Sequence, residues 1–165
     1  MNDRYLFRGK VDFQGETDKD ICDEIRDSIK NYIQKNDWVI GALADYDVIV
    51  GDLMDCNEDG VSFEFWQPIR RETIGQCTGL KDKNGTLIFE GDIVKYNDYF
   101  YNFDKKQNHI GIIEWQNNAA CFRCIRRIID GKPVKQEYGL SALQYQKSEI
   151  IGNIHDNPEL LEVQK

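Results

Sequence analysis

Cysteines and histidines are the residues of this sequence whose types and spacing could do chemistry. Cys121 and Cys124 form a CxxC pair, and a zinc site would need Cys77 with His109 or His155 as further ligands. The segment around the pair reads as a strand, however, and residues three apart on a strand point to opposite faces. The pair is therefore interpreted as structural thiols, with no metal and no cofactor predicted. A metal- or thiol-dependent function remains an alternative.

An acidic pattern, D-x-N-x-D-G, begins at Asp55 and ends at Gly60, and it matches the first half of a calcium loop. The twelfth position of such a loop needs a bidentate glutamate, but Trp66 stands there. A solvated hairpin turn is predicted instead. No nucleophile motif or phosphate-binding glycine loop is present, so no catalytic residues are predicted.

The aromatic segment 95–109 is the first candidate for binding, and from residue 97 it is expected to be mainly a loop. A loop cannot direct all its aromatic side chains into one core, and tyrosine offers contact area with a polar tip. The predicted binding residues are Tyr96, Tyr99, Phe100, Tyr101 and Phe103. The alternative, that the loop covers the domain's own apolar face, is left open.

A basic cluster on a predicted hairpin is the second candidate: Arg123, Arg126, Arg127, Lys132 and Lys135. On a regular strand Arg123 and Arg127 would share one face, with Arg126 on the other. A charge-balanced surface hairpin is favoured over a phosphate or nucleic-acid contact. The cluster could also pair with the acidic half of a second copy of the chain.

Charge is divided unevenly along the 165 residues, whose net charge is −8. Residues 1–72 hold 9 basic and 17 acidic side chains, whereas residues 73–165 hold 12 of each. The split predicts two domains with this boundary, and the acidic half disfavours nucleic acid as a partner because it repels phosphate.

The remaining composition is typical of a protein without a membrane segment. Apolar residues make up 41%, with no run near the ~20 that a membrane helix needs. The first residues show no apolar signal core, and the five cysteines have no regular spacing. A cytoplasmic protein with reduced thiols is therefore expected.

The N-terminal elements predicted to position these residues are one amphipathic helix (17–35) and several short strands. In the helix, apolar residues recur at spacings of four and three, with Thr17 as a cap. Strands are expected at 4–10, 38–43, 47–54 and 60–66, and in the last of these Val61, Phe63 and Phe65 alternate with other residues.

The C-terminal half has strand signals and no long helix. Asn84-Gly85 predicts a type I′ hairpin turn, because both residues tolerate positive φ. Gly91 is expected to relieve a bend, with Asp92 accepting nearby backbone hydrogen bonds. Further strands are expected at 93–96, 110–115, 119–129, 134–140 and 148–154, and a short helix after Asn157-Pro158. This pattern predicts a small barrel or rolled sheet.

Several segments together resemble the YopX family of phage and prophage proteins. They are ETIGQCTGLKDKNGTLIFEGDIVKY (72–96), SEIIGNIHDNPELL (148–161), YLFRGK (5–10) and WVIGAL (38–43). The resemblance implies an α+β fold that is mainly β, with an N-terminal α+β part and a C-terminal SH3-like β-barrel. It implies no reaction, because the family has no established function.

These observations favour a non-catalytic interaction module that binds a protein partner or a second copy of itself. If the aromatic loop is its binding surface, Tyr99→Ala combined with Tyr101→Ala should abolish that association and leave the melting temperature nearly unchanged. Gel filtration and thermal unfolding of the double variant check this. A large loss of stability would instead make the loop part of the core.

Overall fold

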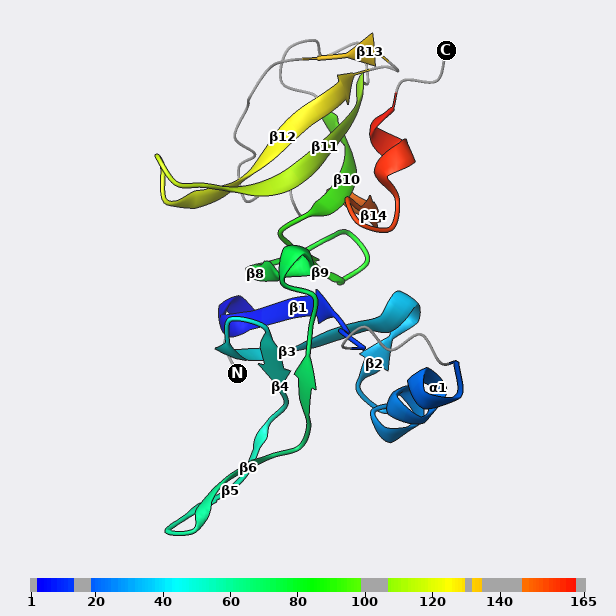
Figure 1. Ribbon diagram of the computed structural model, residues 1–165. Coiled ribbons are helices and arrows are strands. Elements are labelled where there is room, and N and C mark those ends of the chain that lie inside the picture. Colours follow the sequence, from blue (N-terminus) through cyan, green and yellow to red (C-terminus); the bar gives the residue numbers. More distant parts are fainter. Residues whose placement is uncertain (1–2, 14–18, 99–106, 130–131, 135–146, 163–165) are drawn as a thin grey trace. The chain divides into compact units, whose positions relative to one another are not determined.

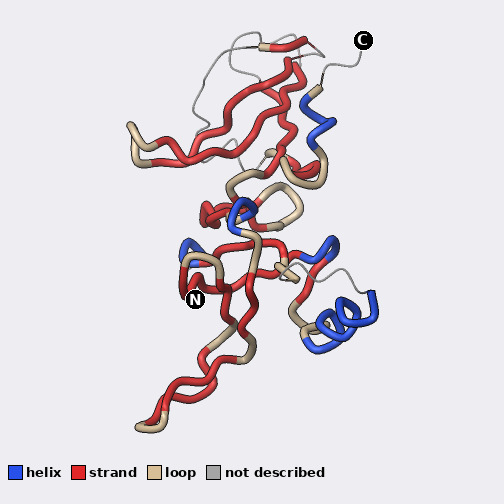
Figure 2. Tube along the Cα trace, in the orientation of Figure 1, coloured by secondary structure: helices blue, strands red, loops and turns tan. Residues whose placement is uncertain are grey.

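The computed structural model describes residues 3–13, 19–98, 107–129, 132–134 and 147–162. These residues are mainly β, with one α-helix, as Figures 1 and 2 show. The chain divides into two compact units, Met1–Gln76 and Cys77–Lys165. Each unit has its own apolar core and is described by itself; the domain boundary after residue 72 stays a prediction.

The first unit is built on an antiparallel sheet in the order β7-β4-β3-β1, with β2 paired to β3 and the first residues of β8 paired to β1. The expected strands near 4–10 and 38–43 are confirmed, whereas each of the strands expected at 47–54 and 60–66 is divided into two, β4 and β5 in the first case and β6 and β7 in the second. The elements are η1 (Asp3–Tyr5), β1 (Leu6–Lys10), α1 (Lys19–Ser28), β2 (Ile33–Gln34), η2 (Lys35–Asp37), β3 (Trp38–Asp45), β4 (Val48–Val50), β5 (Leu53–Asn57), β6 (Gly60–Phe63), β7 (Trp66–Pro68), η3 (Arg71–Thr73) and the start of β8 (Gly75–Lys81).

The predicted helix is present but shorter, because α1 ends at Ser28 and the chain then turns into β2. Ile29 is buried, and its carbonyl accepts hydrogen bonds from both Tyr32 and Ile33. Ile33 then pairs with Val39 in a tight hairpin. A turn over residues 29–32 and strand pairing at 33–34 thus replace the predicted helix, and the prediction of a helix beyond Ser28 is wrong. The expected cap at Thr17 lies outside the described residues.

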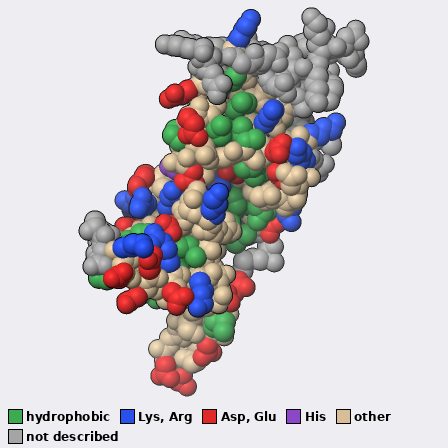
Figure 3. All heavy atoms as spheres, turned by 90° about the vertical axis from the view of Figure 1, so that its right-hand side faces the viewer, with side chains coloured by type: hydrophobic (Ala, Val, Ile, Leu, Met, Phe, Trp, Pro, Cys, Tyr) green, Lys and Arg blue, Asp and Glu red, His purple; other side chains and the backbone are tan. Residues whose placement is uncertain are grey.

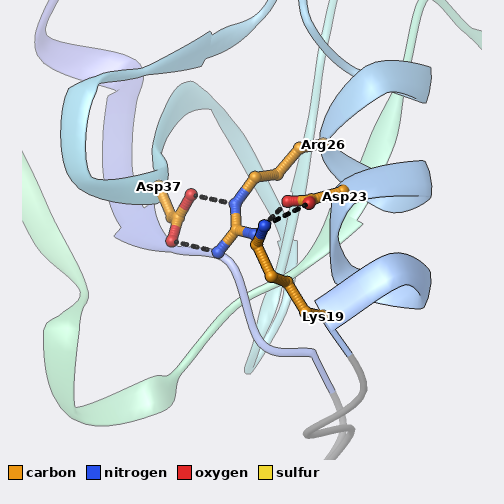
Figure 4. Close-up of polar contacts among 4 residues, drawn as sticks. All are labelled: Lys19, Asp23, Arg26 and Asp37. Atoms are coloured by element: carbon orange, nitrogen blue, oxygen red, sulfur yellow. Dashed lines mark hydrogen bonds and ion pairs between the residues drawn. The ribbon is translucent and has the colours of Figure 1, made fainter.

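A two-pronged ion pair joins α1 to the turn of this hairpin (Figure 4). The Arg26 Nε and Nη2 atoms donate to the two carboxylate oxygens of Asp37 at 2.8 and 3.1 Å, and Nη1 donates to Asp23 at 3.0 Å. The guanidinium also lies 4.7 Å from the centroid of the Phe13 ring. Its hydrogen bond holds the pKa of Asp37 below the ordinary value, against desolvation, which would raise it.

The second unit is built on a five-stranded antiparallel sheet in the order β13-β12-β11-β10-β14. Figure 1 shows that it curls into a half-barrel, which agrees with the predicted rolled sheet. Its core contains Ile88, Val94, Tyr96, Ile113 and Cys124. The elements are the rest of β8, β9 (Leu87–Phe89), β10 (Asp92–Asp98), β11 (Gln107–Gln116), β12 (Cys121–Ile129), β13 (Lys132–Pro133), β14 (Glu149–Asn153) and η4 (Pro158–Leu161).

The turn at Asn84-Gly85 differs in type from the prediction. Of Asn84 and Gly85, only Gly85 has positive φ, so the turn is not type I′. The buried carboxylate of Asp82 organises it, accepting from the backbone N–H groups of Asn84 at 2.8 Å and Thr86 at 3.0 Å. Burial alone would raise the pKa of Asp82, but these donors and Ile150 N–H outweigh it and the pKa is lowered.

The bend at Gly91 is confirmed, since Gly91 has a φ of 81° and Asp92 accepts from the Phe89 N–H at 2.8 Å. The C-terminal helix is a 3₁₀ turn, and Asn157 makes no side-chain cap there. The expected loop is also shorter than 97–109, because β10 continues to Asp98 and β11 begins at Gln107. The strand expected at 134–140 lies almost wholly outside the described residues.

Replacement of Arg26 by Met should lower the free energy of unfolding by about 1 kcal/mol at pH 7. The estimate is modest because Arg26 and Asp37 are 38% and 32% exposed and solvent screens the pair. The folded-state pKa of Asp37 is depressed, so the pair stabilises fully above the unfolded-state value near ~3.9 and its contribution is lost as the pH falls through the folded-state pKa. The R26M variant should therefore lose less stability than the native protein between pH 7 and pH 3.

Urea titrations at the two pH values check this prediction. Lys30→Met is the matched control, because Lys30 and Asp27 form a 3.0 Å pair whose side chains are 65% and 75% exposed. The Lys30→Met variant should not change the free energy of unfolding measurably at either pH. Equal losses in the two variants would show that the Arg26 pair has no special role.

Candidate functional site

The predicted aromatic residues are divided between the core and the part of the chain outside the described residues. Tyr96 lies in β10, is only 2% exposed, and stacks on the buried His109 ring at 5.1 Å between centroids. Its expected place in an accessible loop is therefore wrong, because alternation along β10 directs it into the core. Tyr99, Phe100, Tyr101 and Phe103 lie outside the described residues, and their binding role stays a prediction.

Three of the predicted basic residues, Arg123, Arg126 and Arg127, lie on β12, and Lys132 lies on β13. Arg123 is half-buried opposite Glu114, and Lys132 is exposed. The register passes from Arg126 opposite Gly111 to Ile128 opposite Ile110, so a bulge interrupts the regular alternation that the sequence suggested. Lys135 lies outside the described residues.

The cysteines do not gather into a metal centre in the described part of the chain. No group of three His, Cys, Asp or Glu residues suited to a metal occurs there. Cys124 is buried in the core, and Cys121 is half-buried three residues earlier on the same strand. Cys77 is buried in β8.

The calcium-like pattern is the end of a β-hairpin, as predicted. Asp55 and Asn57 lie on β5, whereas Asp59 precedes Gly60, the first residue of β6. Asn57 donates its amide to Asp55 at 2.9 Å and accepts from the Asp59 N–H at 2.9 Å. The polar side chains of the pattern thus form hydrogen bonds with one another and with the backbone of the turn.

This hairpin is the outer half of a longer one, and we call residues 52–64 the arm. Its inner half is the β4–β7 pair of the sheet, and the ladder continues through the hydrogen bonds Gly51 N–H to Phe65 O and Glu64 N–H to Asp52 O, both 2.9 Å. Figures 1 and 2 show the arm extending away from the rest of its unit. Every residue from 52 to 64 is exposed.

A bulge at Met54 gives the arm one apolar face. Cys56 lies opposite Val61, but Leu53 lies opposite Phe63, so Met54 is an extra residue on β5. Side chains directly opposite each other share a face, and Val61 and Phe63 share one by alternation. Without the bulge, Leu53 would point to the other face. That second face carries polar side chains, Asp55 and Ser62 among them.

The apolar side chains of the arm are well exposed: Leu53 by 58%, Met54 by 68%, Val61 by 56% and Phe63 by 40%. The arm also holds five acidic residues and no basic ones: Asp52, Asp55, Glu58, Asp59 and Glu64. Figure 3 shows acidic side chains at its end and apolar ones on its flank. The arm is therefore a two-faced ribbon with an acidic border.

Phe65 anchors the arm at its base. The Phe65 ring is buried and stacks on Tyr32 at 4.6 Å between centroids. A β-carbon on Gly51 would lie 2.6 Å from this ring, so glycine is required there. Desolvation raises the pKa of the Tyr32 hydroxyl, and the carboxylate of Glu64, which accepts its hydrogen bond, raises it further.

A comparison with known families decides the membership of the chain. The family model described as YopX protein matches residues 14–162. The chain belongs to the YopX family. No curated protein matches this YopX family member significantly. Among solved structures, the crystal structure of protein EF1440 from Enterococcus faecalis shares 29% identity, with 70% of this chain and 79% of that chain covered and a TM-score of 0.42.

Sequence reasoning missed the arm of this YopX family member, although its signals were present. The alternation of Val61, Phe63 and Phe65 indicates a strand, but it does not show that only Phe65 reaches a core. The clearer signal is a segment of five acidic and no basic residues that also carries several apolar ones.

A membrane-spanning helix is not found among the described residues, because none of their helices has the necessary length and apolar character.

The face assignment predicts which engineered cysteine will bond to Cys56. Val61→Cys places a thiol directly opposite Cys56 and on the same face, so mild oxidation should form an intrachain disulfide. Ser62→Cys is the matched control on the opposite face and should stay reduced. Thiol counting by mass spectrometry checks both variants, and faster oxidation of S62C would overturn the assignment.

Proposed function

We propose that this protein is a non-catalytic protein-interaction module, encoded by a phage or prophage, and that the arm is its docking surface. The observation that carries the proposal is the apolar face of Leu53, Cys56, Val61 and Phe63 on an exposed ribbon. Contiguous exposed apolar side chains with a polar border are typical of protein interaction sites.

The energetics of a two-stranded ribbon support this role. An isolated two-stranded hairpin is marginally stable in water, since it has no second layer to cover its apolar face. A partner that covers Leu53, Val61 and Phe63 gains roughly 25 cal/mol for each Å² of apolar surface removed from water. Met54 adds a flexible side chain that adapts to different partner shapes.

The second unit has a supporting role in this proposal. We propose that its curled sheet is the SH3-like barrel that the YopX resemblance implies, and that it is a scaffold. The five cysteines, all within the described residues, form no disulfide bonds, which suits a protein that works in the reducing cytoplasm. The aromatic residues 99–103 remain a second predicted surface for the same function.

Leu53→Ser combined with Phe63→Ser should abolish capture of the partner, because it removes the two opposed apolar side chains at one end of the face. Tagged native and variant proteins are used to capture proteins from host cells, and each captured protein is purified and titrated by calorimetry. We expect at least about a tenfold loss of affinity, equivalent to about 1.4 kcal/mol. The melting temperature should hardly change, because both residues lie outside the core.

The matched control is Ile21→Ser combined with Tyr46→Ser, which removes two apolar side chains exposed by 44% and 74% elsewhere in the first unit. It should keep full affinity. A partner that stays bound to the arm variant, or one that is lost only from the control, would overturn the proposal.

A further inference from the structure

We propose that the partner of the arm is an extended protein segment in which apolar and basic residues alternate, and that it pairs with the arm as a third strand. This inference rests on the proposed docking function and names the chemistry of the partner. Three features of the arm carry it: its open edges, its two unlike faces and its unbalanced charge.

The open edges come from the topology. Among the described residues, β5 and β6 form a two-stranded sheet and pair only with each other. Each outer edge therefore presents backbone donors and acceptors to a further strand. Proteins often bind extended peptides by such strand addition, in which main-chain hydrogen bonds supply affinity and alternate side chains supply specificity.

The two faces determine the pattern of the added strand. A third strand continues both faces of the ribbon, and its residues point alternately to one face and the other. On the face of Cys56 and Val61 it must present apolar side chains. On the face of Asp55 and Ser62 it meets a carboxylate, so a basic side chain there forms a cross-strand pair of opposite charge.

The charge of the arm favours a basic protein segment over a second copy of the chain, a nucleic acid or an anionic lipid surface. No lysine or arginine among the described residues forms an ion pair with the five carboxylates of the arm. Two copies joined arm to arm would bring five acidic residues against five, and like charges across an interface are unfavourable. Phosphate backbones and anionic lipid surfaces are repelled for the same reason.

The position of the carboxylates supports the same conclusion. Glu58 and Asp59 are at the tip, whereas Asp52 and Glu64 are at the base. Acidic side chains thus lie at both ends of the apolar face, and an alternating segment with lysine or arginine near each end matches them. A segment of about seven residues spans the arm, at roughly 3.3 Å a residue.

The test uses three synthetic eight-residue peptides with blocked ends. The first alternates lysine and valine, the second has the same composition in two blocks, and the third alternates glutamate and valine. Each is titrated into the full-length protein labelled for NMR. We expect the first peptide alone to shift the backbone amide signals of residues 52–64, with affinity about tenfold weaker at high salt than at low salt.

Two variants sharpen the test. Asp55→Asn with Asp59→Asn should weaken binding of the alternating basic peptide. Asp45→Asn with Asp47→Asn, which removes two exposed carboxylates outside the arm, should not. Equal binding of the block peptide, binding of the acidic peptide, signal shifts outside the arm, or no binding at all would each overturn the inference. Concentration-dependent dimerisation through the arm would overturn it in favour of a second copy.

This result is separable from the docking proposal. If Leu53→Ser with Phe63→Ser abolishes partner capture but the alternating peptide does not bind, only the inferred chemistry of the partner fails. If that variant keeps its partner, the docking role of the arm fails whatever the peptides do.

Discussion

The packing of Phe65 is the interaction on which the long hairpin of the first unit depends. Its ring lies over Gly51 and stacks on Tyr32, and it is the point at which the hairpin joins the core. From Asp52 to Glu64 every residue is exposed. The buried Phe65 ring therefore marks the point where the β4–β7 strand pair of the sheet ends and the exposed arm begins.

A ribbon of this kind has to remain soluble while its apolar face is uncovered. Exposed strand edges are templates for unwanted pairing, and proteins commonly protect them with charge or with bulges. The arm has both, because five carboxylates border it and Met54 forms a bulge. In the role proposed for the arm, the same carboxylates that oppose pairing between copies would favour a basic partner.

The second unit shows the opposite arrangement, in which buried carboxylates accept hydrogen bonds from the backbone. Asp82 joins the turn after β8 to β14, because its carboxylate accepts the N–H groups of Thr86 and Ile150 as well as Asn84. Asp92 closes the bend at Gly91 by accepting from Phe89. A buried carboxylate with several backbone donors, such as that of Asp82, specifies the local structure of the turn around it.

The sequence by itself determined the type and order of most elements and the family, because periodicity, turn residues and motifs are local properties. It indicated the bend at Gly91 and the hairpin at Asp59-Gly60 for the same reason. Only the tertiary structure decided which apolar residues are covered. Tyr96 and Phe63 both lie on strands, yet one is 2% and the other 40% exposed. That difference depends on what packs against each strand, and a single insertion at Met54 decides which face Leu53 joins.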